Sequence, residues 1–296
     1  MSWLLLFGLL IGAGRADDGL EAALQAQWEQ VRSDARWRSP YAAERTAFRD
    51  GLTALVRVAG TCDEDEVRAA SKTLAAADFA VEHVVDGEDS VLVVREAIEH
   101  RGAGLVAIRC GSARPWVWQA PHALYDLNTG DIARRLFVES GARAVMWNTV
   151  HRYRALPGEA SGDPVHPADV TREFGSLFHA ATVGLATGDP TLRFLQLHGY
   201  AHRSDFPWEA VVSTGDADRP PEAVARALAP VFGTAGAYGT DVNRLGGTEN
   251  VQAEALNAWS EPRFLHLELS PAARRSLADD PEVRGAFLSA FAQAQW

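Results

Sequence analysis

From residue 104 onward, short apolar segments alternate with longer amphipathic segments, and this alternation constrains the fold of the 296-residue chain more than any other feature. Apolar runs such as Leu105–Cys110, Ala142–Val150 and Leu192–Leu197 have the length of buried strands. Further strands are expected over Trp116–Ala120, Ala210–Ser213 and Arg263–Leu269, helices over Asp131–Val138, Phe174–Leu185, Pro221–Val231, Glu249–Trp259 and from Pro271 to the end, and a long loop over Gly233–Gly247. Such alternation predicts an α/β sandwich with a mixed, largely parallel sheet.

The first third of the chain is expected to be mainly helical. The pattern predicts helices over Leu20–Trp37, from the Ser39-Pro40 pair to about Val58, and from a cap at Asp63 to about Ala77, followed by strands over Phe79–Val85 and Val91–Val94. We therefore expect a helical N-terminal region with a small strand pair over 17–103 and an α/β core over 104–296. One continuous domain over 17–296 is the alternative.

The amino terminus resembles an export signal. An apolar run, Trp3–Ile11, is followed by small residues at Gly14 and Ala16, which fit a cleavage site after Ala16. The run is too short to span a bilayer, so no stable membrane span is expected in the mature protein. The sequence thus predicts a signal peptide over 1–16 and a periplasmic or secreted protein; a buried helix or a misassigned start codon is the alternative.

Charge and cysteine content narrow the possible functions. The formal net charge of −11 and the lack of a basic stripe argue against a nucleic-acid partner. The two cysteines, Cys62 and Cys110, could form one disulfide in an oxidising compartment or remain buried thiols, and neither belongs to a C-x-x-C pair. The sequence also lacks a G-x-S-x-G elbow, a G-x-G-x-x-G fingerprint and a P-loop, which disfavours serine hydrolases and nucleotide cofactor enzymes.

Residues able to bind a metal follow two of the expected strands. His122 and Asp126 come after Trp116–Ala120, and His198 comes after Leu192–Leu197. In α/β folds such groups meet beyond the carboxyl ends of the strands. Two imidazoles and one carboxylate with an open fourth position suit a hydrolytic Zn²⁺ ion. A solvated loop histidine is the alternative for His122.

Two further residues suit catalysis. Arg152 follows the strand that ends near Asn148, and its planar guanidinium could hold a substrate carboxylate, although a surface ion pair is possible. Glu268 lies in an apolar strand, where a carboxylate is costly unless it is paired or functional. We expect Glu268 to be the general base; an ion pair with Arg274 or Arg275 is the alternative.

The remaining site candidates have supporting roles. Asn148 and His151 flank Arg152 and are expected to bind substrate together with it, and His202 is expected to bind substrate or to support the site. Asp169 could orient a metal-binding histidine through a hydrogen bond, or act as a helix cap.

The segments Pro121-His122 with Asp126, Asn148-Thr149 with His151-Arg152, and Leu197-His198-Gly199 resemble zinc-dependent amidohydrolases and carboxypeptidases, in particular the branch of N-formylglutamate amidohydrolases and phage poly-γ-glutamate hydrolases. The late strand that carries Glu268 is similar to the family strand that bears the base. The resemblance covers roughly residues 104–275 and implies a three-layer α/β/α sandwich of the zinc-exopeptidase kind. Where zinc carboxypeptidases have His-x-x-Glu, this chain has His-x-x-x-Asp.

Together these features predict an exported zinc-dependent hydrolase that cleaves an amide or peptide bond next to a carboxylate. Its substrate is expected to be a small peptide, an N-acyl amino acid or a polyglutamate-type chain. The departure from His-x-x-Glu leaves an alternative, a non-catalytic periplasmic or envelope binding protein that keeps the hydrolase fold.

Overall fold

A computed structural model of the chain describes residues 19–33, 37–98, 100–154, 166–258 and 263–294. The expected signal peptide over 1–16 lies outside these residues. Within the described ranges, none of the helices has the length and apolar character that crossing a membrane requires.

One nine-stranded mixed sheet forms the centre of the fold, in the order β1-β2-β3-β5-β4-β6-β9-β7-β8. The strands are β1 (Phe79–Asp86), β2 (Asp89–Glu96), β3 (Leu105–Arg109), β4 (Arg114–Ala120), β5 (Ala142–Trp147), β6 (Arg193–Gly199), β7 (Ala210–Ser213), β8 (Ala235–Ala237) and β9 (Phe264–Leu269). The four central strands, β5, β4, β6 and β9, are parallel to their neighbours within this group, whereas β1, β2 and β3 pair in antiparallel fashion. The carboxyl ends of the central strands therefore meet at one edge.

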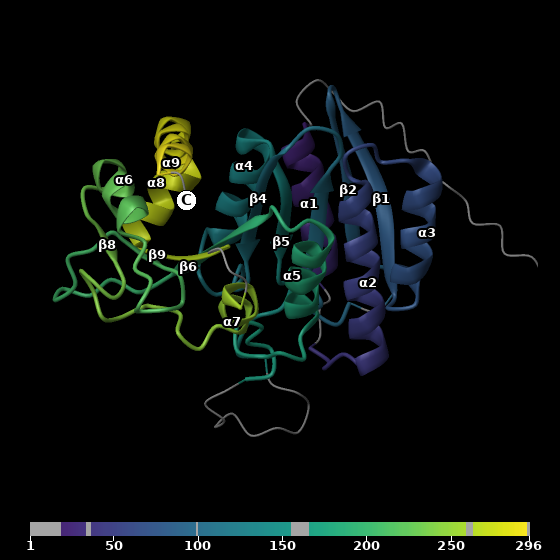
Figure 1. The fold of residues 1–296 in the computed structure, drawn as a ribbon, viewed down its shortest axis with the longest axis horizontal. Helices are drawn as coiled ribbons and strands as arrows, with labels where there is room; N and C mark the ends of the chain where they lie inside the picture. The colour runs from purple at the N-terminus through teal and green to yellow at the C-terminus, as the bar shows by residue number, and fades with distance from the viewer. Residues whose placement is uncertain (1–18, 34–36, 99, 155–165, 259–262, 295–296) are drawn as a thin grey trace, which may run out of the picture.

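Helices cover both faces of the sheet, which gives the expected three-layer α/β/α sandwich. They are α1 (Leu20–Ser33), α2 (Ala42–Val58), α3 (Glu64–Ala75), α4 (Thr129–Ser140), α5 (Leu177–Gly188), α6 (Glu222–Phe232), α7 (Val251–Asn257), α8 (Pro271–Asp279) and α9 (Pro281–Gln293). One core layer includes residues of α1, α4, α6, α8 and α9, and the other includes residues of α2, α3, α5 and α7. Figure 1 shows α2 and α3 beside β1 and β2, and α6, α8 and α9 at the opposite end of the molecule.

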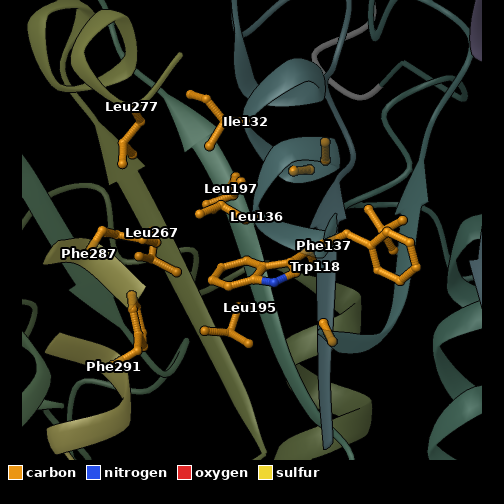
Figure 2. Close-up of a cluster of buried hydrophobic side chains, with 14 of the residues drawn as sticks. Trp118, Ile132, Leu136, Phe137, Leu195, Leu197, Leu267, Leu277, Phe287 and Phe291 are labelled. Carbon is orange, nitrogen blue, oxygen red and sulfur yellow. The ribbon is translucent and has the colours of Figure 1, made fainter. Parts of the chain in front are cut away.

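Side chains along the central strands alternate between the two layers. Trp118 of β4, Leu195 of β6 and Leu267 of β9 point into the layer of α4 and α9, as Figure 2 shows for the cluster around Trp118. Because strand side chains have a period of two, the next residues along each strand face α5 and α7. Gln196 and His266, each one position from these leucines, therefore face the α5 and α7 side. The candidate functional side chains of β6 and β9 lie on that side.

Several elements differ in their bounds from the sequence expectation, and three of the differences have a clear local cause. Helix α2 begins at Ala42 and not after Ser39, because the carboxylate of Glu44 accepts a hydrogen bond from the Tyr41 amide at 2.6 Å and marks the first turn there. The segment from Pro271 onward is two helices, since the Asp280 side chain caps a new helix start at Pro281. The expected loop Gly233–Gly247 contains the three-residue strand β8, whose small residues carry little strand signal.

Cys62 and Cys110 form a disulfide with a Cα–Cα distance of 5.7 Å. The bond joins the turn between α2 and α3 to the residue after β3. The same junction is held by backbone contacts, because the Gly111 amide donates to the Ala59 carbonyl at 2.7 Å. The guanidinium of Arg143 also donates to the Ala59 and Gly111 carbonyls.

The small strand pair β1 and β2 joins the central sheet through β3. The expected division of the chain into a helical N-terminal region and an α/β core at residue 103 stays a prediction.

Candidate metal centre

The turn between β4 and α4 places His122 and Asp126 side by side. The amides of Tyr125 and Asp126 each donate to the His122 carbonyl at 2.8 Å, and the Thr129 hydroxyl donates to the Asp126 carbonyl at 2.7 Å. These bonds close a tight turn before α4 begins. As expected from the sequence, both side chains lie on a turn and not within a helix.

His198 of the neighbouring strand β6 completes a buried cluster. Asp126 Oδ2 lies 3.4 Å from His122 Nδ1 and 3.3 Å from His198 Nδ1. One potential ligand atom from each of the three residues lies within 4.8 Å of the other two. The structure thus gathers three residues from two strand ends into one group that could hold a metal ion.

Hydrogen bonds on the far side of each ring decide which nitrogen faces the cluster as an acceptor. His122 Nε2 lies 2.8 Å from the Asp169 carboxylate, and His198 Nε2 lies 2.8 Å from the amide oxygen of Gln196. Both partners accept hydrogen bonds, so each Nε2 carries the proton in the neutral ring. Both Nδ1 atoms then present lone pairs toward the Asp126 carboxylate.

In this tautomer three acceptors converge, and the donor beside them is the Arg152 guanidinium, 3.1 Å from His122 Nδ1. Two imidazole nitrogens and a carboxylate oxygen are ligands that Zn²⁺ commonly takes, with a fourth position open in catalytic sites. The hydrogen bond from His122 to Asp169 is the outer support typical of metal-binding histidines. The donor set of this chain therefore fits a divalent metal of the zinc type.

The charges of the cluster are consistent with cation binding. Burial opposes ionisation of Asp126, but its contacts with His122 and His198 hold its pKa well below the usual range. Burial, and then the neighbouring His266, lower the pKa of His198 to about 4, so this ring is neutral at neutral pH. Burial alone would lower the pKa of His122, but Asp126 and Asp169 raise it. Asp126 therefore stays ionised between the two rings, as a carboxylate ligand of a cation must.

Glu268 lies beside the cluster because β6 and β9 pair in register, with His198 opposite Glu268. Paired residues of neighbouring strands point to the same face. Glu268 Oε1 lies 3.2 Å from His266 Nε2, while its buried Oε2 has no hydrogen-bond partner among the described residues. The guanidinium of Arg274 donates to the backbone carbonyls of Tyr200 and Leu269. The ion pair with Arg274 or Arg275 that the sequence left open is not found among the described residues.

Arg152 also reaches the cluster. Its guanidinium donates to the Asp169 carboxylate and lies 3.1 Å from His122 Nδ1. Its side chain is 21% exposed, against 1% for His122, so it lies on the more open side of the cluster. The guanidinium also stacks over the rings of Tyr125 and Tyr153, at 5.6 and 5.3 Å from their centroids. Arg152 is therefore part of the site and is held by Asp169.

The remaining sequence candidates are placed less closely. Asn148 is buried and donates to the Val150 carbonyl at 3.1 Å, so its amide group supports the loop that carries Arg152. His151 packs edge-on against Tyr125 with ring centroids 5.3 Å apart. His202 is exposed and has no hydrogen bond or ion pair within the part of the chain that the structure describes.

Sequence reasoning missed the polar residues under the cluster, chiefly Gln196, Asn250, Gln252 and His266. One signal for Gln196 was available: it lies two positions before His198 in a strand and so shares its face. No comparable signal identifies Asn250 and Gln252, because their approach depends on how α7 packs against the sheet.

No protein-family model and no curated protein sequence matches the chain. Among solved structures, it is similar to a succinylglutamate desuccinylase from Vibrio parahaemolyticus, with 14% identity, a TM-score of 0.43, and 72% of this chain and 76% of that chain covered. It is also similar to a candidate carboxypeptidase from Burkholderia mallei, with 10% identity and a TM-score of 0.38. That match covers 73% of this chain but spans only 63% of the length of the other protein.

Proposed function

We propose that the protein is a zinc-dependent hydrolase that cleaves an amide or peptide bond next to a carboxylate. The observation that carries the proposal is the convergence of one ring nitrogen each of His122 and His198 and one carboxylate oxygen of Asp126 at the ends of β4 and β6. Two imidazole nitrogens and one carboxylate oxygen, with a fourth position open, form a ligand set of catalytic Zn²⁺ sites.

A bound zinc ion would supply an acidified water and polarise the substrate carbonyl. Glu268 is our candidate general base, since it lies opposite His198 in the strand register and its Oε2 is free of protein partners among the described residues. Its role is to accept a proton from the attacking water and later to pass one to the leaving amine. Asp169 orients His122 and at the same time holds Arg152 beside it.

Arg152 is our candidate for binding the substrate carboxylate. The guanidinium donates to Asp169 and lies beside His122, and its side chain, 21% exposed, is on the open side of the cluster. Since the chain carries a formal net charge of −11, an anionic substrate needs such a local cation. The substrates that suit this chemistry are small peptides, N-acyl amino acids and polyglutamate-type chains.

We further propose that the protein acts outside the cytoplasm, in the periplasm or after secretion. The disulfide between Cys62 and Cys110 supports this location, because such bonds persist mainly in oxidising compartments. Production with and without an oxidising export route, followed by thiol titration, tests it.

Metal analysis of the purified protein tests the function. We expect near-stoichiometric zinc in the wild type, a sharp loss in His122→Asn and His198→Asn, and full retention in His83→Asn, a control at an exposed position of strand β1. Wild-type zinc content in both site variants would refute the site.

The second test is Glu268→Gln. We expect this variant to keep its metal and to lose hydrolysis of N-acyl amino acids by about 10²- to 10⁴-fold, the usual contribution of a general base. Loss of metal would instead make Glu268 a ligand. Wild-type protein that binds metal but hydrolyses no carboxylate-bearing amide would favour the binding-protein alternative.

A further inference from the structure

A layer of buried amide side chains lies beneath the metal centre, on the face of the sheet that carries His198. Gln196 of β6 is its central member, and it pairs in register with Gln119 of β4 and His266 of β9. Asn250 and Gln252, at the start of α7, complete the layer. All four amide side chains are buried, so each must find hydrogen-bond partners within the protein.

Gln196 accepts two hydrogen bonds on its amide oxygen and donates from its amide nitrogen in the opposite direction. The oxygen lies 2.8 Å from His198 Nε2 and 2.5 Å from the Asn250 nitrogen. The nitrogen donates to the amide oxygens of Gln119 and Gln252, at 2.9 and 3.4 Å.

Backbone groups fix the direction of each neighbouring amide. The Gln252 nitrogen donates to the Val170 carbonyl at 2.8 Å, so the Gln252 oxygen faces Gln196. The Asn250 oxygen accepts from the amides of Gln252 and Ala253, so the Asn250 nitrogen faces Gln196.

A hydroxyl fixes the direction of Gln119 in the same way. Thr182 donates its only hydroxyl proton to the Phe178 carbonyl and therefore accepts from the Gln119 nitrogen at 2.9 Å. The Gln119 oxygen consequently faces Gln196. Three independent anchors thus set the orientation of Gln196, and a flipped amide would oppose donor to donor and acceptor to acceptor.

The same short helix supports the other histidine of the cluster. The Val251 amide donates to the Thr171 carbonyl at 2.9 Å, and the Thr171 hydroxyl donates to Asp169 Oδ1 at 2.8 Å. Asp169 Oδ1 in turn contacts His122 Nε2. The start of α7 therefore supports both groups that accept a hydrogen bond from a cluster histidine.

We infer that Gln196, held by Asn250 and Gln252, is a positioning residue that keeps the proton of His198 on Nε2 and so leaves Nδ1 free to bind the metal. The inference rests on the proposed function, because it names the residue that positions one of the proposed metal ligands. Without the Gln196 oxygen, the proton would move to Nδ1, where Asp126 Oδ2 at 3.3 Å accepts it. The nitrogen required for the metal would then be blocked.

The test replaces Gln196 with Met, which has a similar shape but no strong acceptor. Zinc affinity, measured by competition with a chelator, is expected to fall 10- to 100-fold, as is usual when the outer support of a metal ligand is removed. Ser140→Ala is the control: it removes a buried hydrogen bond, donated by Trp118 Nε1 at 3.2 Å, in the layer on the opposite face of the sheet. We expect Ser140→Ala to retain the wild-type zinc affinity. Equal affinities for all three proteins, or equal losses in both variants, would overturn the inference.

A second readout does not depend on metal binding. The ¹⁵N chemical shifts of His198 in metal-free protein should report an Nε2–H ring in the wild type and an Nδ1–H ring in Gln196→Met. An Nδ1–H ring in the wild type would refute the inference even if zinc binds. If the wild type binds no zinc, the proposed function fails, and the tautomer still decides the role of Gln196.

If Gln196→Met does not fold, as judged by its thermal transition, Gln252→Met provides the same two readouts from a different element. That variant removes the hydrogen bond that the Gln196 nitrogen donates to the Gln252 oxygen. We expect a smaller loss of zinc affinity than in Gln196→Met. Unchanged affinity and tautomer in Gln252→Met would then refute the bracing role of α7.

Discussion

Replacing both Cys62 and Cys110 with Ala is expected to destabilise the protein mainly through its unfolded state. The disulfide closes a loop with a sequence separation of 48 residues. The loop-closure model assigns such a cross-link about 4 kcal/mol at 25 °C. For a chain of 296 residues, that corresponds to a fall in the melting temperature of roughly 6 °C.

The folded junction should survive the change. The Gly111 amide still donates to the Ala59 carbonyl, and Arg143 still donates to the Ala59 and Gly111 carbonyls. We therefore expect circular dichroism and zinc content close to those of the wild type. In urea unfolding without reductant, the midpoint should fall and the m-value should rise, because the unfolded chain exposes more surface.

The control separates the bond from its two side chains. Wild type and double variant should have the same unfolding free energy, within about 1 kcal/mol, when both are measured in reductant. A loss below about 1 kcal/mol without reductant would refute the reasoning, as would a reduced wild type that is as stable as the oxidised one.

Three other variants test separate features. Arg152→Lys should raise the KM for a carboxylate-bearing substrate about tenfold, because the variant loses the guanidinium fork. The KM for an amidated analogue should stay unchanged. Equal increases for both substrates would indicate a role in folding alone. Burial lowers the pKa of His179 to about 4, below the value of about 6.5 in the unfolded chain. Below about pH 6.5 the unfolded chain therefore binds a proton that the folded protein does not. Up to about 3 kcal/mol of unfolding free energy is lost as the pH falls toward 4. His179→Gln should flatten that acid limb in urea titrations, and an unchanged limb would contradict the assignment. Gly104→Ala should lower the unfolding free energy by about 2 kcal/mol more than Gly111→Ala. Both glycines have a positive φ, but at Gly104 an added Cβ atom would also lie 2.4 Å from the Trp147 carbonyl oxygen, whereas it would meet nothing at Gly111. Equal unfolding free energies of the two variants would refute this.

The layered fold could be predicted because the two periodicities of the chain are local. Strands such as Ala210–Ser213 have the bounds expected from the sequence, and Asp63 caps α3 as expected. Strand β8 could not be predicted, since Ala235–Ala237 owes its pairing to β7 and not to its own composition. The start of α2 depended on the single carboxylate of Glu44.

The metal cluster could be anticipated because the carboxyl ends of parallel strands meet in space. The adjacency of His122 and His198 follows from the pairing of β4 with β6, which the sequence does not specify but the alternation of elements favours. The contact of Asp169 with His122 spans 47 residues and depends on tertiary packing. For Asn250 and Gln252 the sequence shows only an ordinary helix start.

The in-register pairing of β6 and β9 limits how this protein can change by insertion or deletion. One residue gained between Phe264 and Glu268 would turn the carboxylate toward Trp118 and the apolar layer, and would bring Leu267 or its neighbour to the polar face. Two added residues would restore the face but displace Glu268 by about 7 Å along the strand. Length variants that preserve the site should therefore fall in the surface loops. Within β9 a substitution leaves the register with β6 unchanged, whereas a change of length shifts it.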